Sequence, residues 1–267
     1  MKEQPLWGKN IVVTRPAHQA QALARLIEGA GGRAILFPAI EIREVEDLGP
    51  FLRLVERLDR FDLAILISPN AVDRAMPVIQ SRGTLPRGLK VAAVGGGTVR
   101  ALERHGVTGA IAPQGRYDSE ALLALREVAA ARQVVIFRGE GGRELLGDTL
   151  RARGAAVEYA ECYRRAKPDL DATVLLRAWS DKALDAVTVT SSEGLRNVFE
   201  MVGGAGRESL QHTPLFAPHP RIADAARECG VRKVIVTGPG DEGLLAGLIA
   251  YFSAQRQDGA ARKRRDS

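Results

Sequence analysis

The chain has 267 residues, of which 45% are hydrophobic and 26% are charged, values that are usual for a soluble globular protein. No apolar stretch approaches the roughly 20 residues of a membrane-spanning helix, and the first residues lack the apolar core of a signal peptide. The net charge of +6 is modest, half of it lies in residues 256–267, and aromatic residues make up only 5%, so nucleic-acid binding is not indicated.

Cysteine and histidine are too scattered to predict a metal site. Cys162 and Cys229 form no paired motif, and the four histidines share no metal-ligand spacing. We therefore expect no metal, and the unpaired cysteines favour a reducing, cytoplasmic location.

The first predicted elements form a strand–helix–strand unit over residues 10–43. An apolar strand, Ile11–Thr14, ends at Arg15 and is followed by a helix with apolar residues at helical spacing. A pair of glycines, Gly31 and Gly32, ends this helix before the second strand.

The next segments alternate between helices and short apolar strands. We expect helices over 48–58 and from residues 71, 99 and 118 or 119, and strands over 62–67, 91–94 and 111–113. Small polar residues or glycines follow the strands over 62–67 and 91–94.

Residues 133–165 repeat the opening unit. The apolar run Val134–Phe137 predicts a buried parallel strand that ends at Arg138 and Gly139, as the first copy ends at Arg15. A short helix and a second strand, to residue 163, follow. This glycine-rich turn lies where ligands bind in open α/β sheets, at the carboxyl end of a strand.

Later segments also have earlier counterparts. Residues 185–200 resemble 62–76, and residues 213–249 resemble 89–125. The chain thus consists of three consecutive segments that occur twice in the same order. Each set of three supplies the alternating strands and helices of a small doubly wound parallel sheet.

The repeat leaves two domain arrangements open. Two sequential domains would divide near Ala131. A crossed arrangement would combine the opening unit of each set with the later parts of the other, and the chain would cross near residues 38–43 and 158–165. Both crossing segments alternate polar and apolar residues and are compatible with a two-stranded connector.

Two glycine motifs suggest loops that bind ligands. Gly238–Gly243 (GPGDEG) matches the dinucleotide pattern GxGxxG, but the basic tail replaces the strand and acidic residue that should follow, which favours a simple helix-entry turn. Gly95–Thr98 (GGGT) can direct backbone N–H groups at an anion at the start of a helix.

Polar residues at the predicted strand ends are the candidate binding groups. Each one alone is typical of a helix cap. Together they predict two facing edges of donors that could hold a large polyanion, without a nucleophile triad or an acid–base pair. The candidate binding residues are Thr14, Arg15, Ser68, Asn70, Gly95, Gly97, Thr98, Arg138, Gly139, Ser191, Ser192, His219 and Arg221, and the candidate proton donor is Tyr163.

Six motifs in this order and spacing resemble the uroporphyrinogen-III synthase family over roughly residues 9–252. They are VTRP at 13–16, the strand and Ser-x-Asn of 62–70, VAAVGGGT at 91–98, FRGEGGRELL at 137–146, ECYRR at 161–165 and TSSEGLRN at 190–197. One departure is Pro218–Arg221, where some relatives carry a Gly-Pro-Thr-Thr-like turn and where Arg221 would replace a threonine contact.

The resemblance implies an α/β fold of two similar small doubly wound parallel-sheet domains joined by a two-stranded β connector. The expected boundaries are residues 1–38 with 166–255 for the first domain, 43–158 for the second, 39–42 and 159–165 for the connector, and 256–267 for a disordered basic tail.

The resemblance also implies the activity, which is closure of hydroxymethylbilane to uroporphyrinogen III with loss of water and inversion of the last pyrrole ring. It implies no cofactor, substrate held mostly by backbone N–H groups, and Tyr163 as the acid. We expect a monomer with no nucleic-acid or membrane partner, to which the preceding pathway enzyme could hand the substrate. A non-catalytic sensor of a polyanion and, on GPGDEG, a nucleotide-dependent oxidoreductase are the alternatives.

Overall fold

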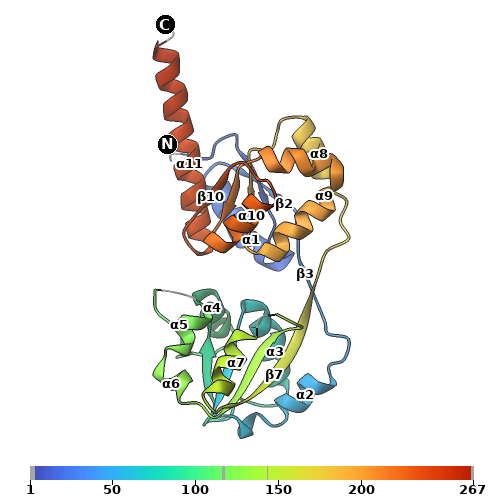
Figure 1. Cartoon of the computed structure of the whole chain (residues 1–267), viewed down its shortest axis with the longest axis vertical. Helices are drawn as coiled ribbons and strands as arrows, with labels where there is room; N and C mark the ends of the chain where they lie inside the picture. The colour runs from blue at the N-terminus through green and yellow to red at the C-terminus, as the bar shows by residue number, and fades with distance from the viewer. Residues whose placement is uncertain (1–3, 116–117, 143, 266–267) are drawn as a thin grey trace. The chain divides into compact units, whose positions relative to one another are not determined.

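The computed structural model describes residues 4–115, 118–142 and 144–265, and the chain divides into two compact units. The first unit comprises Met1–Glu41 with Ala166–Ser267, and the second comprises Ile42–Arg165 (Figure 1). The chain therefore passes from one unit to the other twice, at residues 41–42 and 165–166.

The first unit is built on a five-stranded sheet of order β10-β9-β8-β1-β2, whose recorded pairs are all parallel. The chain order reverses between β1 and β8, which makes the sheet doubly wound. Its elements are β1 (Asn10–Val13), α1 (Ala17–Gly29), β2 (Arg33–Leu36), α8 (Thr173–Ser180), β8 (Ala186–Thr188), α9 (Ser192–His212), β9 (Leu215–Ala217), α10 (Pro220–Glu228), β10 (Val234–Val236) and α11 (Gly240–Arg265).

Helices cover both faces of this sheet, which explains why Ile11, Val12 and Val13 of β1 are all apolar. Ile11 and Val13 pack with α1 and α11, whereas Val12 packs with α8, α9 and α10 on the opposite face. Successive side chains of a strand point to opposite faces, so a strand buried on both sides needs a continuous apolar run rather than alternation.

The second unit contains a sheet of order β3-β7-β6-β4-β5, with parallel pairing of β5, β4, β6 and β7. Its elements are β3 (Glu41–Arg43), α2 (Gly49–Val55), the 3₁₀ helix η1 (Leu58–Arg60), β4 (Leu63–Leu66), α3 (Pro69–Ser81), β5 (Lys90–Ala93), α4 (Gly96–Arg104), α5 (Ser119–Leu123), α6 (Arg126–Ala129), β6 (Gln133–Gly139), α7 (Leu145–Ala152) and β7 (Ala156–Ala166). In β4, Leu63 and Ile65 pack with α5, α6 and α7, and Ala64 and Leu66 pack with α2, α3 and α4.

Strand pairing distinguishes the two arrangements that the repeat left open. The strand β1 of the first opening unit pairs with β8, and the strand β6 of the second pairs with β4. Each sheet thus combines the opening unit of one set with later strands of the other, which is the crossed order. The segments predicted as a connector, 39–42 and 159–165, overlap β3 and the second half of β7, which are neighbouring strands at the edge of the second sheet.

The structure differs from the sequence predictions in three places. The predicted helix over 48–58 is divided into α2 and η1, and the predicted strand over 111–113 is a single bridge between Ile111 and Ala92. The segment from residue 256, predicted to be disordered, continues α11 to Arg265. Extending a helix that core packing has already nucleated requires much less free energy than starting a new one. Among the described residues no helix is both long and apolar enough to cross a membrane.

Candidate functional site

The carboxyl edge of the second sheet gathers the polar residues predicted for this unit. Parallel strands end at one edge, so Ser68 after β4, Gly95 after β5 and Gly139 at the end of β6 lie on the same side of the sheet. Tyr163 of β7 lies opposite Gly139 in the strand register. Chain order reverses between β4 and β6, and this reversal is where open α/β sheets bind ligands.

Tyr163 is held inside this edge by a contact with Ser68. The tyrosine is 2% exposed, and its Oη lies 3.1 Å from Ser68 Oγ. Ser68 is also the N-cap of α3, where its Oγ accepts a hydrogen bond of 3.1 Å from the Ala71 N–H. The phenol therefore lies at the N-terminus of α3, where the helix dipole favours negative charge.

The absence of a side chain at Gly139 makes room for the Tyr163 ring. A Cβ added to Gly139 would lie 2.6 Å from Cε2 and 2.7 Å from Cζ of Tyr163. The Glu140 N–H also donates a 2.7 Å hydrogen bond to the Tyr163 carbonyl. Gly139, predicted as a binding residue, thus fixes the position of the tyrosine by close packing.

Arg138 differs from the prediction, because its guanidinium is directed inward rather than toward a ligand. The residue is 2% exposed. Its Nε donates to the Gly139 carbonyl at 3.3 Å, Nη1 to Glu144 Oε1 at 3.1 Å, and Nη2 to the Gly141 carbonyl. The guanidinium also lies 4.6 Å from the centre of the Tyr159 ring. A cation with this many internal partners stabilises the loop that follows β6.

The GGGT motif forms the beginning of α4 beside the beginning of α3. Gly95 is the N-cap with extended backbone, and Thr98 is buried with its N–H donating to the Gly95 carbonyl at 2.9 Å. A Cβ on Gly97 would lie 3.6 Å from Pro69 Cγ, so the two helix starts are adjacent. Asn70 is half-buried in the first turn of α3. Pro69 has no N–H and the Ala71 N–H is taken by Ser68, so the backbone donors that suit an anion here are mainly those of Gly96 and Gly97 at the start of α4.

The corresponding edge of the first unit begins at Thr14, whose hydroxyl is used inside the sheet. Thr14 Oγ1 donates to the Thr188 carbonyl at 2.8 Å, and Thr188 Oγ1 donates to the Val12 carbonyl at 3.0 Å. Both threonines are buried. The pair connects the ends of β1 and β8, where the chain order reverses.

Arg15 forms an ion pair with Asp241, a residue that the sequence analysis did not select. Its Nη2 lies 2.9 Å from Asp241 Oδ1, and the two side chains are 20% and 17% exposed. Burial lowers the pKa of Arg15, and the negative charges of Asp241 and Glu242 oppose this effect. Asp241 belongs to the GPGDEG motif, which was read for its glycines rather than its carboxylates.

The glycines of GPGDEG are explained by packing. A Cβ on Gly243 would lie 2.8 Å from Gly238 Cα, so the first turn of α11 touches the preceding loop. Gly240 has a φ of 75°, in the left-handed region that glycine adopts without strain. These contacts account for the motif as the helix-entry turn that the sequence favoured.

The remaining predicted residues of the first unit lie at the starts of α9 and α10. Ser191 is the N-cap of α9 and accepts a 2.9 Å hydrogen bond from the Gly194 N–H, and Ser192 is the first residue of that helix. His219 is the N-cap of α10, with its Nδ1 accepting from the Arg221 N–H at 3.1 Å. His219 and Arg221 are exposed.

Comparisons with known proteins point to one family along nearly the whole chain. The family model described as "Uroporphyrinogen-III synthase HemD" matches residues 21–246. The uroporphyrinogen-III synthase of Escherichia coli K12 is 35% identical over 242 residues, which cover 88% of this chain and 98% of that protein. The chain belongs to the uroporphyrinogen-III synthase family.

Other members of this family support the assignment and the fold. The uroporphyrinogen-III synthase of Synechococcus elongatus is 30% identical over 206 residues, 76% of this chain and 78% of that protein. A crystal structure of a mutant uroporphyrinogen III synthase from Thermus thermophilus matches with a TM-score of 0.62 at 22% identity, covering 93% of this chain and 99% of that one. The Helicobacter pylori 26695 synthetase matches with a TM-score of 0.56 at 15% identity, covering 91% and 99%. These two similarities establish the two-domain α/β fold of the family.

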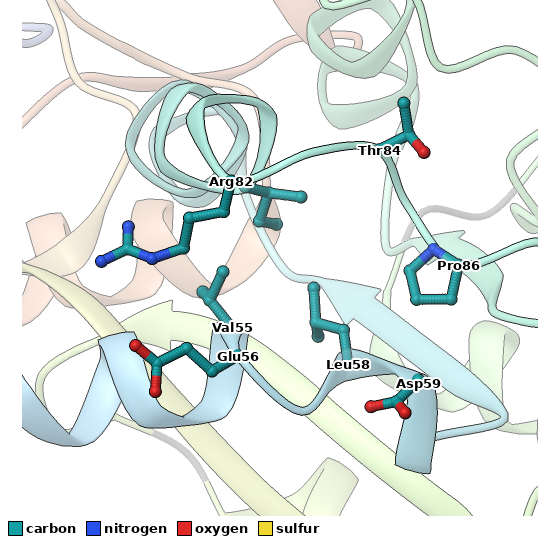
Figure 2. Close-up of a pocket in the computed structure, with 8 residues that line it drawn as sticks. Val55, Glu56, Leu58, Asp59, Arg82, Thr84 and Pro86 are labelled. Atoms are coloured by element: carbon teal, nitrogen blue, oxygen red, sulfur yellow. The ribbon is translucent and has the colours of Figure 1, made fainter.

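A pocket of the second unit lies at the edge of the sheet opposite the predicted binding residues. Its volume is about 190 Å³, and it lies beside the residues that precede β4 and β5 (Figure 2). The lining residues are Val55, Glu56, Leu58, Asp59, Ile79, Arg82, Thr84 and Pro86. The lining holds two carboxylates and one guanidinium, so it does not match the anion-binding site that the sequence predicts.

Cys162, the neighbour of Tyr163 on β7, has a structural role in this uroporphyrinogen-III synthase fold. Its Sγ lies 3.4 Å from the Arg138 carbonyl, and burial raises the pKa of the thiol to about 12. The cysteine is therefore a neutral packing residue at ordinary pH. Among the described residues, no group of three or more His, Cys, Asp or Glu side chains is arranged to hold a metal ion.

Proposed function

We propose that this member of the uroporphyrinogen-III synthase family closes the linear tetrapyrrole hydroxymethylbilane into uroporphyrinogen III, with loss of water and inversion of the last pyrrole ring. The observation that carries the proposal is the 35% identity with the Escherichia coli enzyme over 98% of its length. The positions of Tyr163 and Ser68 at the reversal of the second sheet support it, because they place a proton donor where this fold binds ligands.

The chemistry requires one proton donor and a means of folding the substrate. The C–O bond of the terminal hydroxymethyl group breaks as the electron pair of its pyrrole nitrogen enters the ring, and the departing oxygen takes a proton and leaves as water. The last pyrrole then attacks the resulting cation through its already substituted carbon, which gives a spiro intermediate. Reopening and closure through the other carbon invert that ring, and loss of a ring proton restores aromaticity.

We assign the proton donation to Tyr163. A phenol is protonated at neutral pH and can donate to the departing oxygen. Because Tyr163 is 2% exposed, substrate binding must uncover Oη, and its hydroxyl must exchange Ser68 for the substrate oxygen. The helix N-terminus beside it favours the phenolate that remains.

We assign the substrate carboxylates to the donors at the sheet edges. The first turn of α4 offers backbone N–H groups in the second unit, and Arg15, His219 and Arg221 offer side-chain donors in the first. That both edges contact one substrate stays a prediction. The GPGDEG motif does not favour an oxidoreductase, since packing explains its glycines.

Tyr163→Phe tests the assignment. We expect kcat to fall about 100-fold, toward the low end of typical general-acid effects, with the melting temperature almost unchanged because the ring is kept. The measurement is the rate of type III isomer formation from enzymatically made hydroxymethylbilane. Tyr159→Phe, on the same strand, is the control and should keep the rate. A full rate in Tyr163→Phe would show that Tyr163 only packs, and tight binding without ring closure by the wild type would indicate a sensor.

We also propose a partner and a location for this activity. We infer a monomer that works in the cytoplasm, where the pathway is supplied with its precursors. The enzyme that makes hydroxymethylbilane is the expected source, and direct hand-over would protect a substrate that loses hydroxide readily. Trapping of free hydroxymethylbilane during a coupled reaction would measure whether the intermediate is released.

A further inference from the structure

The Ser68 hydroxyl contacts two groups, a backbone N–H of α3 and the Tyr163 hydroxyl, and each contact serves a different purpose. Its Oγ accepts from the Ala71 N–H at 3.1 Å, which caps α3, and lies 3.1 Å from Tyr163 Oη. Tyr163 is 2% exposed and Ser68 is half-buried. The serine was selected from the sequence as a direct ligand of substrate, but in the structure its oxygen faces the phenol.

Although it caps α3, the Ser68 hydroxyl can still form a hydrogen bond with either the neutral phenol or the phenolate of Tyr163. A hydroxyl has one hydrogen and two acceptor lone pairs. The Ala71 N–H occupies one lone pair, so Ser68 can accept from the neutral phenol with the other. When the phenol hydrogen turns from Ser68 to the substrate oxygen, the Ser68 hydrogen can rotate and donate to Oη. After proton transfer this becomes a charge-assisted bond to the phenolate, which is stronger than the bond it replaces.

The Tyr163 ring has little freedom to move away from this hydroxyl. On Gly139, a Cβ would lie 2.6 Å from the ring, and the Tyr163 carbonyl accepts a 2.7 Å bond from the Glu140 N–H. The phenol position is therefore set by two features, the close approach of Gly139 and the hydrogen bond to Ser68.

We propose that Ser68 is a positioning residue that acts on ring closure through Tyr163, by orienting the neutral phenol and stabilising the phenolate after proton donation, and that it does not bind a substrate carboxylate. This inference rests on the proposed function. It predicts that Ser68 matters only while Tyr163 has its hydroxyl, and that its loss lowers kcat with little change in KM.

The experiment is a double-mutant cycle with Ser68→Gly and Tyr163→Phe in the full-length protein. Glycine is chosen because it is a good N-cap, so α3 should still begin at the same residue. We expect Ser68→Gly to lower kcat about 10-fold, and the double variant to be no slower than Tyr163→Phe alone. Ser68→Thr keeps a hydroxyl and should recover most of the rate.

Two controls separate this role from stability and from the proposed function. Asp118→Ala removes another N-cap, the 2.8 Å bond to the Ala121 N–H at α5, and should lower the melting temperature while kcat is kept. Multiplying effects in the double variant, or a raised KM with normal kcat in Ser68→Gly, would overturn the inference. A wild type that forms no uroporphyrinogen III would instead refute the proposed function.

Discussion

The two copies of the repeated strand–helix–strand unit carry arginines at matching positions, Arg15 after β1 and Arg138 near the end of β6. The environments of these two arginines differ. Arg138 is 2% exposed and donates to the Gly139 and Gly141 carbonyls and to Glu144. Arg15 keeps a side-chain exposure of 20% and is paired with Asp241 of a distant helix. The same position in the repeat thus stabilises a loop in one unit and forms a partly exposed ion pair in the other.

The largest effect should come from Arg138→Gln. Loss of the guanidinium leaves loop carbonyls without their donor, and a buried unsatisfied group typically costs about 1–3 kcal/mol. We expect the free energy of unfolding, measured in urea, to fall by about 2–3 kcal/mol. Arg15→Gln leaves the partly exposed Asp241 without its cation, so it should change the free energy of unfolding by about 1–2 kcal/mol and also raise KM. Equal destabilisation by the two variants would remove the contrast between the units.

An intermediate effect should come from Asp241→Asn, which releases Arg15. The carboxylate competes with an anionic substrate for the guanidinium, so removing its charge should lower KM about 2- to 5-fold. KM should also become more sensitive to salt, because the partly exposed guanidinium then has dissolved ions in place of its fixed partner. Glu242→Gln removes a charge one residue further along and is the control, with a smaller expected change. A raised KM in Asp241→Asn would mean that the ion pair orients Arg15 for the substrate.

The smallest effect should come from truncation after Gln255. This removes the 2.6 Å bond from Arg256 Nη2 to the Pro5 carbonyl but leaves Leu248 and Phe252 in the core. We expect kcat/KM to be unchanged and the free energy of unfolding to fall by less than about 1 kcal/mol. Truncation after Tyr251 removes Phe252 as well and should cost about 3–5 kcal/mol. A loss of turnover on the shorter truncation would assign a function to the tail.

The sequence predicted more of the fold than of the contacts within the site. Apolar runs such as Leu63–Leu66 predict buried strands because both faces are covered, and the repeat predicts that sheets of one kind occur twice. The choice between sequential and crossed order depends on which strands pair, and periodicity carries no information on that choice.

The contacts of the site could not be read from local patterns. The bond between Ser68 and Tyr163 joins residues 95 apart and depends on the register of three strands. Arg138 was predicted to bind substrate, because its position after an apolar run does not reveal which carbonyls surround its guanidinium. Asp241 was missed since its motif was judged by its glycines, although a carboxylate in the first turn of a helix was a usable signal.

The crossed strand order has a consequence for synthesis on the ribosome. The second unit is complete once residue 165 has emerged, whereas β1 must wait for β8, β9 and β10, which end at Val236. At a synthesis rate of about 5–20 residues per second, β1 and α1 wait roughly 4–14 s between completion of the second unit and synthesis of β10. Their apolar faces stay uncovered during this time. A nascent chain halted in this interval should bind a chaperone through its N-terminal segment while its middle part already resists protease.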